Sequence, residues 1–163
     1  MTNAVAEIST PTSAGAQGAQ AERSQLAPLE VVILSYNERE NIPHAIRSVV
    51  GWVSRVIVID SGSTDGTQQL ARDLGAHVID HPWEGYARQK NWAFEHAGIT
   101  APWVLVLDSD EVVTPELQTE IAALCKRPVD SVEEAGFYIN RYDVRRPADS
   151  ALWLFPQLEP AAL

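Results

Sequence analysis

The sequence has one cysteine, no long apolar run and no leader-like segment. Because Cys125 stands alone among 163 residues, the chain can form neither an internal disulfide nor a cysteine-based zinc site. No stretch approaches the roughly 18 apolar residues that a membrane-spanning helix needs, and the first residues lack the basic and then apolar regions of a signal peptide. These absences predict a cytoplasmic protein in a reducing compartment, and they leave peripheral contact with the inner face of the membrane open.

Basic residues are also few, with 12 Lys and Arg against 22 Asp and Glu, which gives a formal net charge of -10 at pH 7. Binding to the backbone of nucleic acid depends on clustered Lys and Arg, so this charge argues against a nucleic-acid partner. An acidic chain needs a metal cation or local hydrogen-bond donors to hold an anionic substrate. Its 45% hydrophobic content is enough for one sizeable core, which predicts a single folded domain.

Strand and helix patterns alternate along the chain after residue 27. Residues 1–27 contain no aromatic side chain and no sustained apolar periodicity, which predicts a disordered tail. The alternation that follows predicts an α/β fold with a doubly wound, mainly parallel sheet, whose ligands bind at the carboxyl ends of the strands. The expected strands are residues 29–34, 56–59, 77–79, 104–107 and 136–140, and the expected helices are residues 42–50, 65–74, 86–97 and 114–124.

Capping residues support these helices. Asn37, with Glu40 or Asn41, is able to cap the start of the first helix, and Gly51 is able to end it. Thr114 followed by proline is a good N-cap and first-turn pair for the last helix.

Polar clusters follow three of the expected strands, at residues 35–38, 60–67 and 108–111. The topology brings the ends of these strands to one edge of the sheet. The second cluster is a loop of small residues that opens a helix, and such a loop can offer free backbone N–H groups to an anion. A tight strand-to-helix turn with a cap explains that cluster equally well.

Among these polar residues, Asp108 and Asp110 give the most specific indication of chemistry. In an extended strand their side chains project to the same face, with Cα atoms roughly 6.6 Å apart. They can then converge on one hard cation, or divide the work between a metal and a sugar hydroxyl, and such oxygen ligands suit Mg²⁺ or Mn²⁺. The alternative is a polar strand end in which Asp110 or Glu111 helps to begin the next helix.

Three segments together resemble a known family. Val-Ile-Leu-Ser-Tyr-Asn-Glu, Val-Ile-Asp-Ser-Gly-Ser-Thr-Asp-Gly-Thr and Leu-Asp-Ser-Asp-Glu are similar, in order and spacing, to successive signatures of family 2 glycosyltransferases with the GT-A fold. Residues 81–93 further resemble the subgroup that adds a glucose or heptose to the core of bacterial lipopolysaccharide. The resemblance covers residues 29 to 142, so residues 28–142 are expected to form the nucleotide-sugar-binding domain and 143–163 an atypical C-terminal tail.

The resemblance implies contacts to the nucleoside of a UDP-sugar donor. Tyr36 would lie against the uracil ring, with the backbone of Ser35 nearby, and Asp60 would accept a hydrogen bond from the base. Asp108 would hold the ribose. Many relatives have two consecutive acidic residues where this chain has Asp60 followed by Ser61, which leaves the expected base contact to Asp60 alone.

The resemblance also implies contacts to the diphosphate. Asp110 would bind the Mn²⁺ or Mg²⁺ ion that bridges the phosphates. Lys90 matches a basic position near the nucleotide, and Asn91 is its usual neighbour.

The implied function is inverting transfer of a sugar from a UDP-sugar to a glycan or lipid-linked acceptor. No residue is identified as the catalytic base, because the tail does not resemble the family's continuation and offers only Asp143, Asp149 and Glu159 as carboxylates. The chain is therefore expected to be the donor-binding half of a truncated member. The alternative function is a nucleotide-sugar-binding fragment without turnover.

Other candidates are weaker. A nucleotidyltransferase lacks its basic glycine-rich loop here, and an aspartate-nucleophile phosphatase would need an Asp where this chain has Gly62. His77 and His81 flank an expected strand and are interpreted as surface or packing histidines. Trp83, Trp92 and Trp103 are open to two interpretations, an acceptor platform or core packing.

Overall fold

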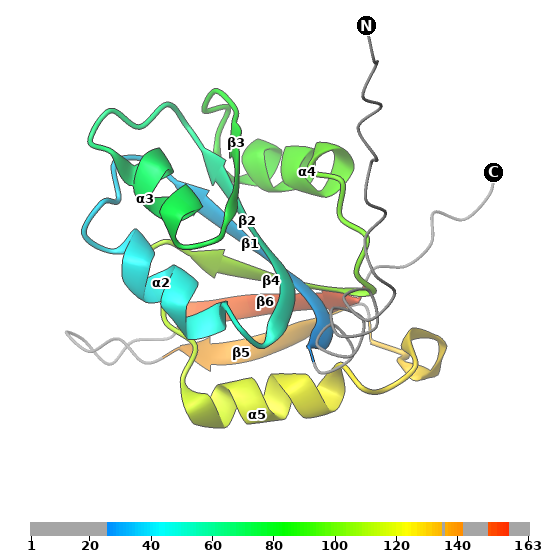
Figure 1. Cartoon of the computed structure of the whole chain (residues 1–163). Coiled ribbons are helices and arrows are strands. Elements are labelled where there is room, and N and C mark those ends of the chain that lie inside the picture. Colours follow the sequence, from blue (N-terminus) through cyan, green and yellow to red (C-terminus); the bar gives the residue numbers. More distant parts are fainter. Residues whose placement is uncertain (1–25, 135, 142–149, 157–163) are drawn as a thin grey trace, which may run out of the picture.

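The computed structural model describes residues 26–134, 136–141 and 150–156, which form one six-stranded sheet with helices on both faces (Figure 1). The strand order is β3-β2-β1-β4-β6-β5. Strands β1 to β4 are parallel to one another, whereas β6 is antiparallel to both β4 and β5. The predicted doubly wound, mainly parallel α/β fold is confirmed. The strands are β1 Ala27–Ser35, β2 Val53–Asp60, β3 His77–Asp80, β4 Trp103–Asp108, β5 Phe137–Arg141 and β6 Ser150–Pro156.

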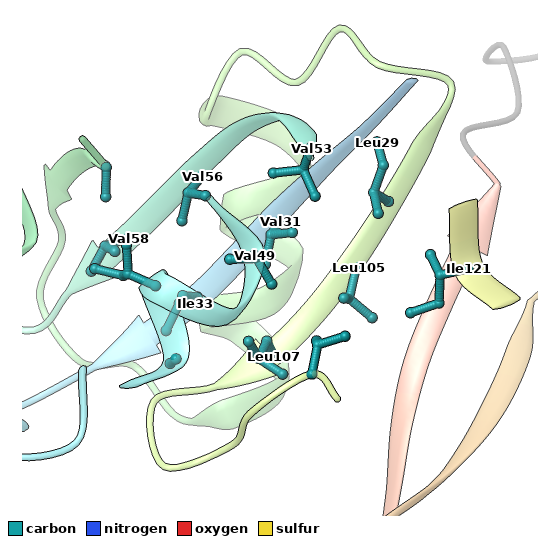
Figure 2. Close-up of a cluster of buried hydrophobic side chains, with 14 of the residues drawn as sticks. Leu29, Val31, Ile33, Val49, Val53, Val56, Val58, Leu105, Leu107 and Ile121 are labelled. Atoms are coloured by element: carbon teal, nitrogen blue, oxygen red, sulfur yellow. The ribbon is translucent and has the colours of Figure 1, made fainter. Parts of the chain in front are cut away.

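The strands alternate their apolar side chains between two cores, which is why the central runs are apolar without interruption. On one face, Val31, Ile33 and Leu105 pack with α2 (Ile42–Val49), α3 (Thr67–Asp73) and α5 (Pro115–Leu124), as Figure 2 shows for part of this cluster. On the other face, Val32 and Ile57 pack against α4 (Tyr86–His96). A short 3-10 helix, η1 (Val129–Ser131), follows α5.

Helix boundaries differ from the prediction where a glycine or a turn intervenes. Helix α3 begins at Thr67 rather than at residue 65, because Gly66 has φ +91°, a left-handed conformation that a helix cannot continue. Asn41 holds the N-cap position of α2 without a side-chain cap bond, and Asn37 bonds elsewhere. The predicted cap of α5 is present, since the Thr114 side chain accepts a hydrogen bond from the Leu117 N–H.

Strand β6 is absent from the elements that the sequence predicts. Residues 150–156 belong to the segment expected as an atypical tail, yet they pair with β4 and β5 inside the sheet. The strand pairs with Trp103–Val106, about fifty residues earlier in the chain, so its partner is not visible in the local pattern. Of the expected disordered tail, residues 1–25 lie outside the described residues, and Ala27 begins β1. Residues 143–149 and 157–163, with the tail carboxylates Asp143, Asp149 and Glu159, also lie outside them.

Cys125 is expected to be unreactive in the folded chain. It is buried in the core beside α5, and burial raises the pKa of its thiol to about 12. Since the thiolate is the nucleophile, a thiol reagent at neutral pH should label the native chain at least about 100-fold more slowly than the unfolded chain. Absorbance of the released chromophore in native buffer and in denaturant measures both rates. Rapid stoichiometric labelling of the native chain would contradict the burial of this side chain.

Candidate donor-binding site

The ends of four parallel strands meet at one edge of the sheet, which we call the donor rim. The register pairs Ser35 with Asp60, Leu34 with Asp108, and Asp60 with Asp80. The loops that follow β1, β2 and β4 therefore begin side by side. These three loops hold the three polar clusters that the sequence singles out.

Asp60 is fully buried at the centre of the donor rim. One oxygen accepts hydrogen bonds from the backbone N–H groups of Gly62 (3.1 Å) and Ser63 (2.7 Å) and from Gln68 Nε2 (2.8 Å). The other accepts from the hydroxyls of Ser35 (2.6 Å) and Ser63 (2.6 Å). Burial alone would raise the pKa of Asp60, but the hydrogen bonds from Ser35, Ser63 and Gln68 outweigh it and lower that pKa below its usual value.

These five hydrogen bonds argue against the expected role of Asp60 as an acceptor for the base of the nucleotide. A base N–H can reach its carboxylate only by displacing one of the internal donors. The arrangement instead fixes the shape of the loop after β2, because three of the bonds come from that loop itself.

Four backbone N–H groups in and just after the loop that follows β2 donate to side chains of the protein. The Thr64 N–H donates to Asn37 Oδ1 (2.9 Å), and the Thr67 N–H donates to Asp65 Oδ1 (3.0 Å). Those of Gly62 and Ser63 are bound to Asp60. The expectation that this loop offers free N–H groups to an anion is therefore wrong for these four groups, and the alternative of a tight strand-to-helix turn describes the loop.

The loop after β1 is attached to the loop after β2. Asn37 has φ +54°, which is uncommon for a residue other than glycine, and its N–H donates to Ser63 Oγ (2.8 Å). The Glu38 N–H donates to Thr67 Oγ1 (2.9 Å), and the Arg39 N–H donates to Asp65 Oδ2 (3.1 Å). Tyr36 is the first residue of this loop, and its side chain is 60% exposed. The donor rim thus carries an exposed aromatic ring on a backbone held in place, which is suited to stacking against a planar base.

Asp108 and Asp110 do not lie on one extended strand. Strand β4 ends at Asp108, and Ser109 and Asp110 form a turn closed by a hydrogen bond from the Glu111 N–H to the Asp108 carbonyl oxygen (3.0 Å). The Glu111 carboxylate in return accepts from the Asp108 N–H (2.8 Å). The alternation argument for this pair is therefore wrong. Asp108 is half-buried, whereas Asp110 is exposed at the donor rim.

The donor set at this turn suits a hard cation only together with a substrate. Among the described residues there is no group of three or more His, Cys, Asp or Glu side chains that could hold a metal ion. An exposed carboxylate such as that of Asp110 fits the way in which Mg²⁺ binds through one or two carboxylates plus substrate phosphates and water.

Helix α4 is joined to the donor rim by Gln89, a residue that the sequence does not single out. Its side chain is fully buried, and its Nε2 donates to Ser61 Oγ (3.2 Å) and to the His81 carbonyl oxygen (3.2 Å). The sequence does carry a signal for the burial of Gln89. It is spaced four and eight residues before Ala93 and Ala97, so all three lie on the same, buried face of the helix. Lys90 is half-buried and Asn91 exposed on the same helix.

The tryptophans do not form one platform. Trp103 is fully buried in the core, at the start of β4 and away from the donor rim. Trp92 is half-buried and stacks on His81, with ring centroids 3.9 Å apart. Trp83 is 49% exposed and meets Tyr86 edge to face. The packing interpretation therefore holds for Trp103, and His81 is a packing histidine as predicted.

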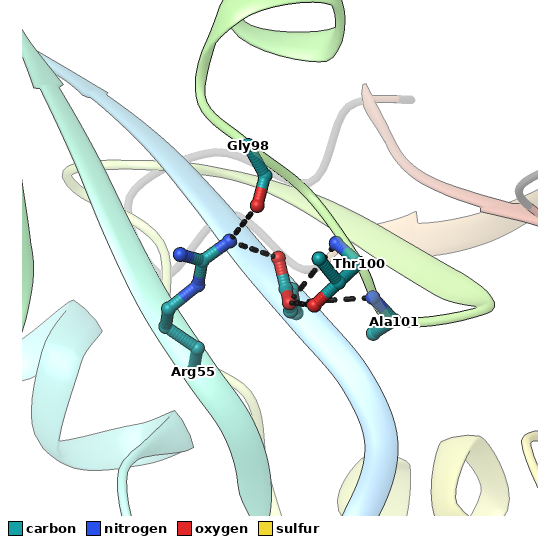
Figure 3. A network of polar contacts seen from close by, with 5 residues as sticks. Arg55, Gly98, Thr100 and Ala101 are labelled. Carbon is teal, nitrogen blue, oxygen red and sulfur yellow. Dashed lines mark hydrogen bonds and ion pairs between the residues drawn. The ribbon is translucent and has the colours of Figure 1, made fainter.

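A second polar cluster, which we call the Glu30 network, lies toward the starts of β1, β2 and β4, away from the strand ends that form the donor rim. Figure 3 shows its contacts. Glu30 is buried and accepts hydrogen bonds from Arg55 Nη2 (2.8 Å) and from the hydroxyl (3.0 Å) and N–H (3.3 Å) of Thr100 and the N–H of Ala101 (3.3 Å). Arg55 also donates to the Gly98 carbonyl oxygen (2.5 Å). Glu30, Arg55 and Thr100 line an open hollow of about 280 Å³ there.

The comparison with protein families identifies the family to which the chain belongs. The model described as "Glycosyl transferase family 2" matches residues 30–156, which cover β1 from Glu30 onward and strands β2 to β6 in full. The chain belongs to glycosyl transferase family 2. The match continues past Tyr142, where the sequence resemblance was expected to end, and through strand β6.

Curated family 2 relatives are longer than this chain. A glycosyltransferase from Rickettsia felis is 44% identical over 93 residues, which make up 57% of this chain and 32% of the relative. The lipopolysaccharide core biosynthesis glycosyltransferase LpsC from Rhizobium meliloti is 36% identical over 89 residues, which make up 52% of this chain and 32% of LpsC. The chain thus spans about a third of the length of the curated relatives that it matches.

The solved structures agree on the fold. Staphylococcus aureus TarS (residues 1–349) matches with a TM-score of 0.55 and 21% identity, over 75% of this chain and 38% of its own. The chain therefore has the GT-A glycosyltransferase fold. Its membership of glycosyl transferase family 2 makes it a transferase by family. Mycobacterium tuberculosis glucosyl-3-phosphoglycerate synthase, solved with Mg²⁺ and UDP, is 29% identical over 59% of this chain and 37% of its own. Its TM-score to this chain is 0.44.

In residues 26–134, 136–141 and 150–156, no helix has both the length and the apolar character that crossing a bilayer requires.

Proposed function

We propose that this chain binds the UDP-sugar donor of a family 2 glycosyltransferase at the donor rim. The observation that carries the proposal is the pair of hydrogen-bonded loops after β1 and β2, which fix an exposed Tyr36 beside the ends of β2 and β4. A uracil ring would stack on Tyr36 near the backbone of Ser35. The half-buried Asp108 would hold the ribose, because its strand is the other neighbour of β1.

The diphosphate would lie toward Asp110 and α4. Asp110 and the phosphates would together hold Mg²⁺ or Mn²⁺, and the ion would supply stabilisation of the negative charge that builds on the leaving diphosphate. Lys90 supplies a cation from α4, and Asn91 a polar group beside it. Among the described residues Lys90 forms no salt bridge, so its charge is available to a phosphate.

The reaction proposed for the whole family member is inverting transfer of the sugar to a glycan or lipid-linked acceptor hydroxyl. The relative named for lipopolysaccharide core biosynthesis supports an acceptor of that kind. Donor binding is the part proposed for this chain, since it spans about a third of such relatives. A place in lipopolysaccharide biosynthesis and the cytoplasmic localisation stay predictions.

The test of this function is metal-dependent binding of UDP. We expect calorimetry to show UDP binding that is at least about tenfold tighter with Mn²⁺ than with chelator, because an acidic protein needs the cation to hold a diphosphate. Asp110→Asn should abolish most of that difference. Glu116→Gln, an exposed change in the first turn of α5, is the matched control and should leave it unchanged. Equal affinity with and without metal, or an Asp110→Asn chain that keeps the metal effect, would exclude Asp110 as the ligand.

A further inference from the structure

The end of β2 presents a hydroxyl that is held by a buried amide. Ser61 directly follows Asp60, is half-buried, and accepts a hydrogen bond from Nε2 of the fully buried Gln89 (3.2 Å). This is the one hydrogen bond of the Ser61 hydroxyl within the part of the chain that the structure describes. Ser61 therefore lies at the donor rim with a hydroxyl that can form further hydrogen bonds beyond those made to the described residues.

The direction of the hydrogen bond between Gln89 and Ser61 is fixed by His81. The carbonyl oxygen of His81 can only accept, so the amide atom 3.2 Å from it must be the Gln89 nitrogen. The Gln89 oxygen then lies 3.0 Å from His81 Nδ1, which must donate to it. Gln89 consequently offers Ser61 an N–H and no acceptor. The Ser61 oxygen accepts the hydrogen bond from Gln89 with one lone pair. Its hydroxyl hydrogen and its second lone pair remain available to a ligand.

The Asp60 carboxylate, by contrast, has no lone pair left for a ligand, because five donors within the protein already bond its two oxygens. The end of β2 therefore offers a ligand a hydroxyl and not a carboxylate. We propose that the Ser61 hydroxyl, oriented by Gln89, contacts the pyrimidine base of the donor and accepts uracil and cytosine alike. This specificity rests on the proposed function of donor binding.

The tolerance follows from hydrogen-bonding chemistry. Uracil presents an N3–H beside a carbonyl oxygen, and cytosine presents an N3 lone pair beside an amino group. A hydroxyl both donates and accepts, so it can satisfy either edge, whereas an ionised carboxylate only accepts. A carboxylate at this position would pair with the N3–H of uracil and would be repelled by the N3 lone pair of cytosine.

The experiment compares UDP, CDP and ADP as ligands of the whole chain in the presence of Mn²⁺. Wild type should bind UDP and CDP with affinities within about threefold of each other. Ser61→Asp should raise the preference for UDP over CDP by about tenfold or more, because the introduced carboxylate mispairs with cytosine. Ser61→Ala should weaken UDP and CDP together by about three- to tenfold and leave ADP unchanged. Ser61→Thr keeps the hydroxyl and should therefore keep the affinities for both UDP and CDP.

The matched control is Ser54→Ala, which removes an exposed hydroxyl at the opposite end of the same strand and should change none of these affinities. Thermal unfolding of each variant shows whether it is folded. Rejection of CDP by wild type of more than about 100-fold, or unchanged pyrimidine affinities in Ser61→Ala, would overturn the role of Ser61 while leaving donor binding intact. A wild-type chain that binds no nucleoside diphosphate would overturn the proposed function and this proposal together.

Discussion

Replacing Asp60 with alanine is expected to lower the free energy of unfolding by about 3 kcal/mol. The carboxylate is fully buried and accepts five hydrogen bonds, so its removal leaves two backbone N–H groups without their acceptor and Gln68 with Asp80 as its remaining one. Asp60→Asn should lower the free energy of unfolding less, by about 1 to 2 kcal/mol, because the amide oxygen keeps one set of donors and the serine hydroxyls can reverse to accept from the amide nitrogen. Urea denaturation at neutral pH measures both values.

A matched control for Asp60 is available in the neighbouring strand. Asp80 pairs with Asp60 in the register and accepts from the same Gln68 side chain (3.1 Å), but it is exposed. Asp80→Ala should therefore change the free energy of unfolding by less than about 0.5 kcal/mol. If Asp60→Ala were as mild as Asp80→Ala, the hydrogen bonds of Asp60 would not be what holds the loop after β2.

The contribution of Asp60 should also depend on pH. Its hydrogen bonds lower the pKa of the folded state below that of the unfolded chain, so the folded carboxyl stays ionised at pH values where the unfolded one takes up a proton. Its stabilisation is then fully present above about pH 4, near the pKa of an unfolded aspartate, and is lost as the pH falls through the lower folded pKa. The difference in stability between wild type and Asp60→Asn should shrink over that acidic range. A difference that stays constant with pH would contradict the lowered pKa.

Replacing Arg55 with methionine is expected to have the second largest effect, a loss of about 3 kcal/mol in the free energy of unfolding. Its guanidinium pairs with Glu30, whose side chain is 3% exposed, so the change leaves a buried carboxylate without its counter-charge. The two Thr100 donors and the Ala101 N–H remain, but all three are neutral.

A double-mutant cycle separates this ion pair from lost packing. In a Glu30→Gln background there is no buried charge to compensate, so Arg55→Met should cost at least about 1 kcal/mol less than it does in wild type. The Glu30 network lies toward the starts of the strands, away from the donor rim, and folded variants should bind UDP as wild type does. A cost of Arg55→Met that is the same in both backgrounds would show that the charge of Glu30 contributes nothing to the pair.

The fold could be predicted from the sequence where short-range patterns are strong. Uninterrupted apolar runs marked β1, β2 and β4, since strands buried on both faces lack polar alternation. Thr114 and the proline after it marked the start of α5 through a local cap. Strand β6 escaped prediction because the pairing that creates it joins residues 150–156 to β4, far away in the chain.

The sequence by itself determined the family, the order of strands β1 to β4 along the chain, and the location of polar clusters after three of them, because each of these depends on residues that are neighbours in the chain. Only the tertiary structure decided what those polar residues do. Asp60 is occupied by donors from Ser35, its own loop and Gln68, and Asp110 lies in a turn after β4 that the Glu111 N–H closes. Gln89 reaches Ser61 across 28 positions of sequence. A polar group either forms its hydrogen bonds within the protein or remains available to a ligand. Which of the two happens depends on the donors and acceptors that folding brings within about 3 Å of it, and these come from the whole chain.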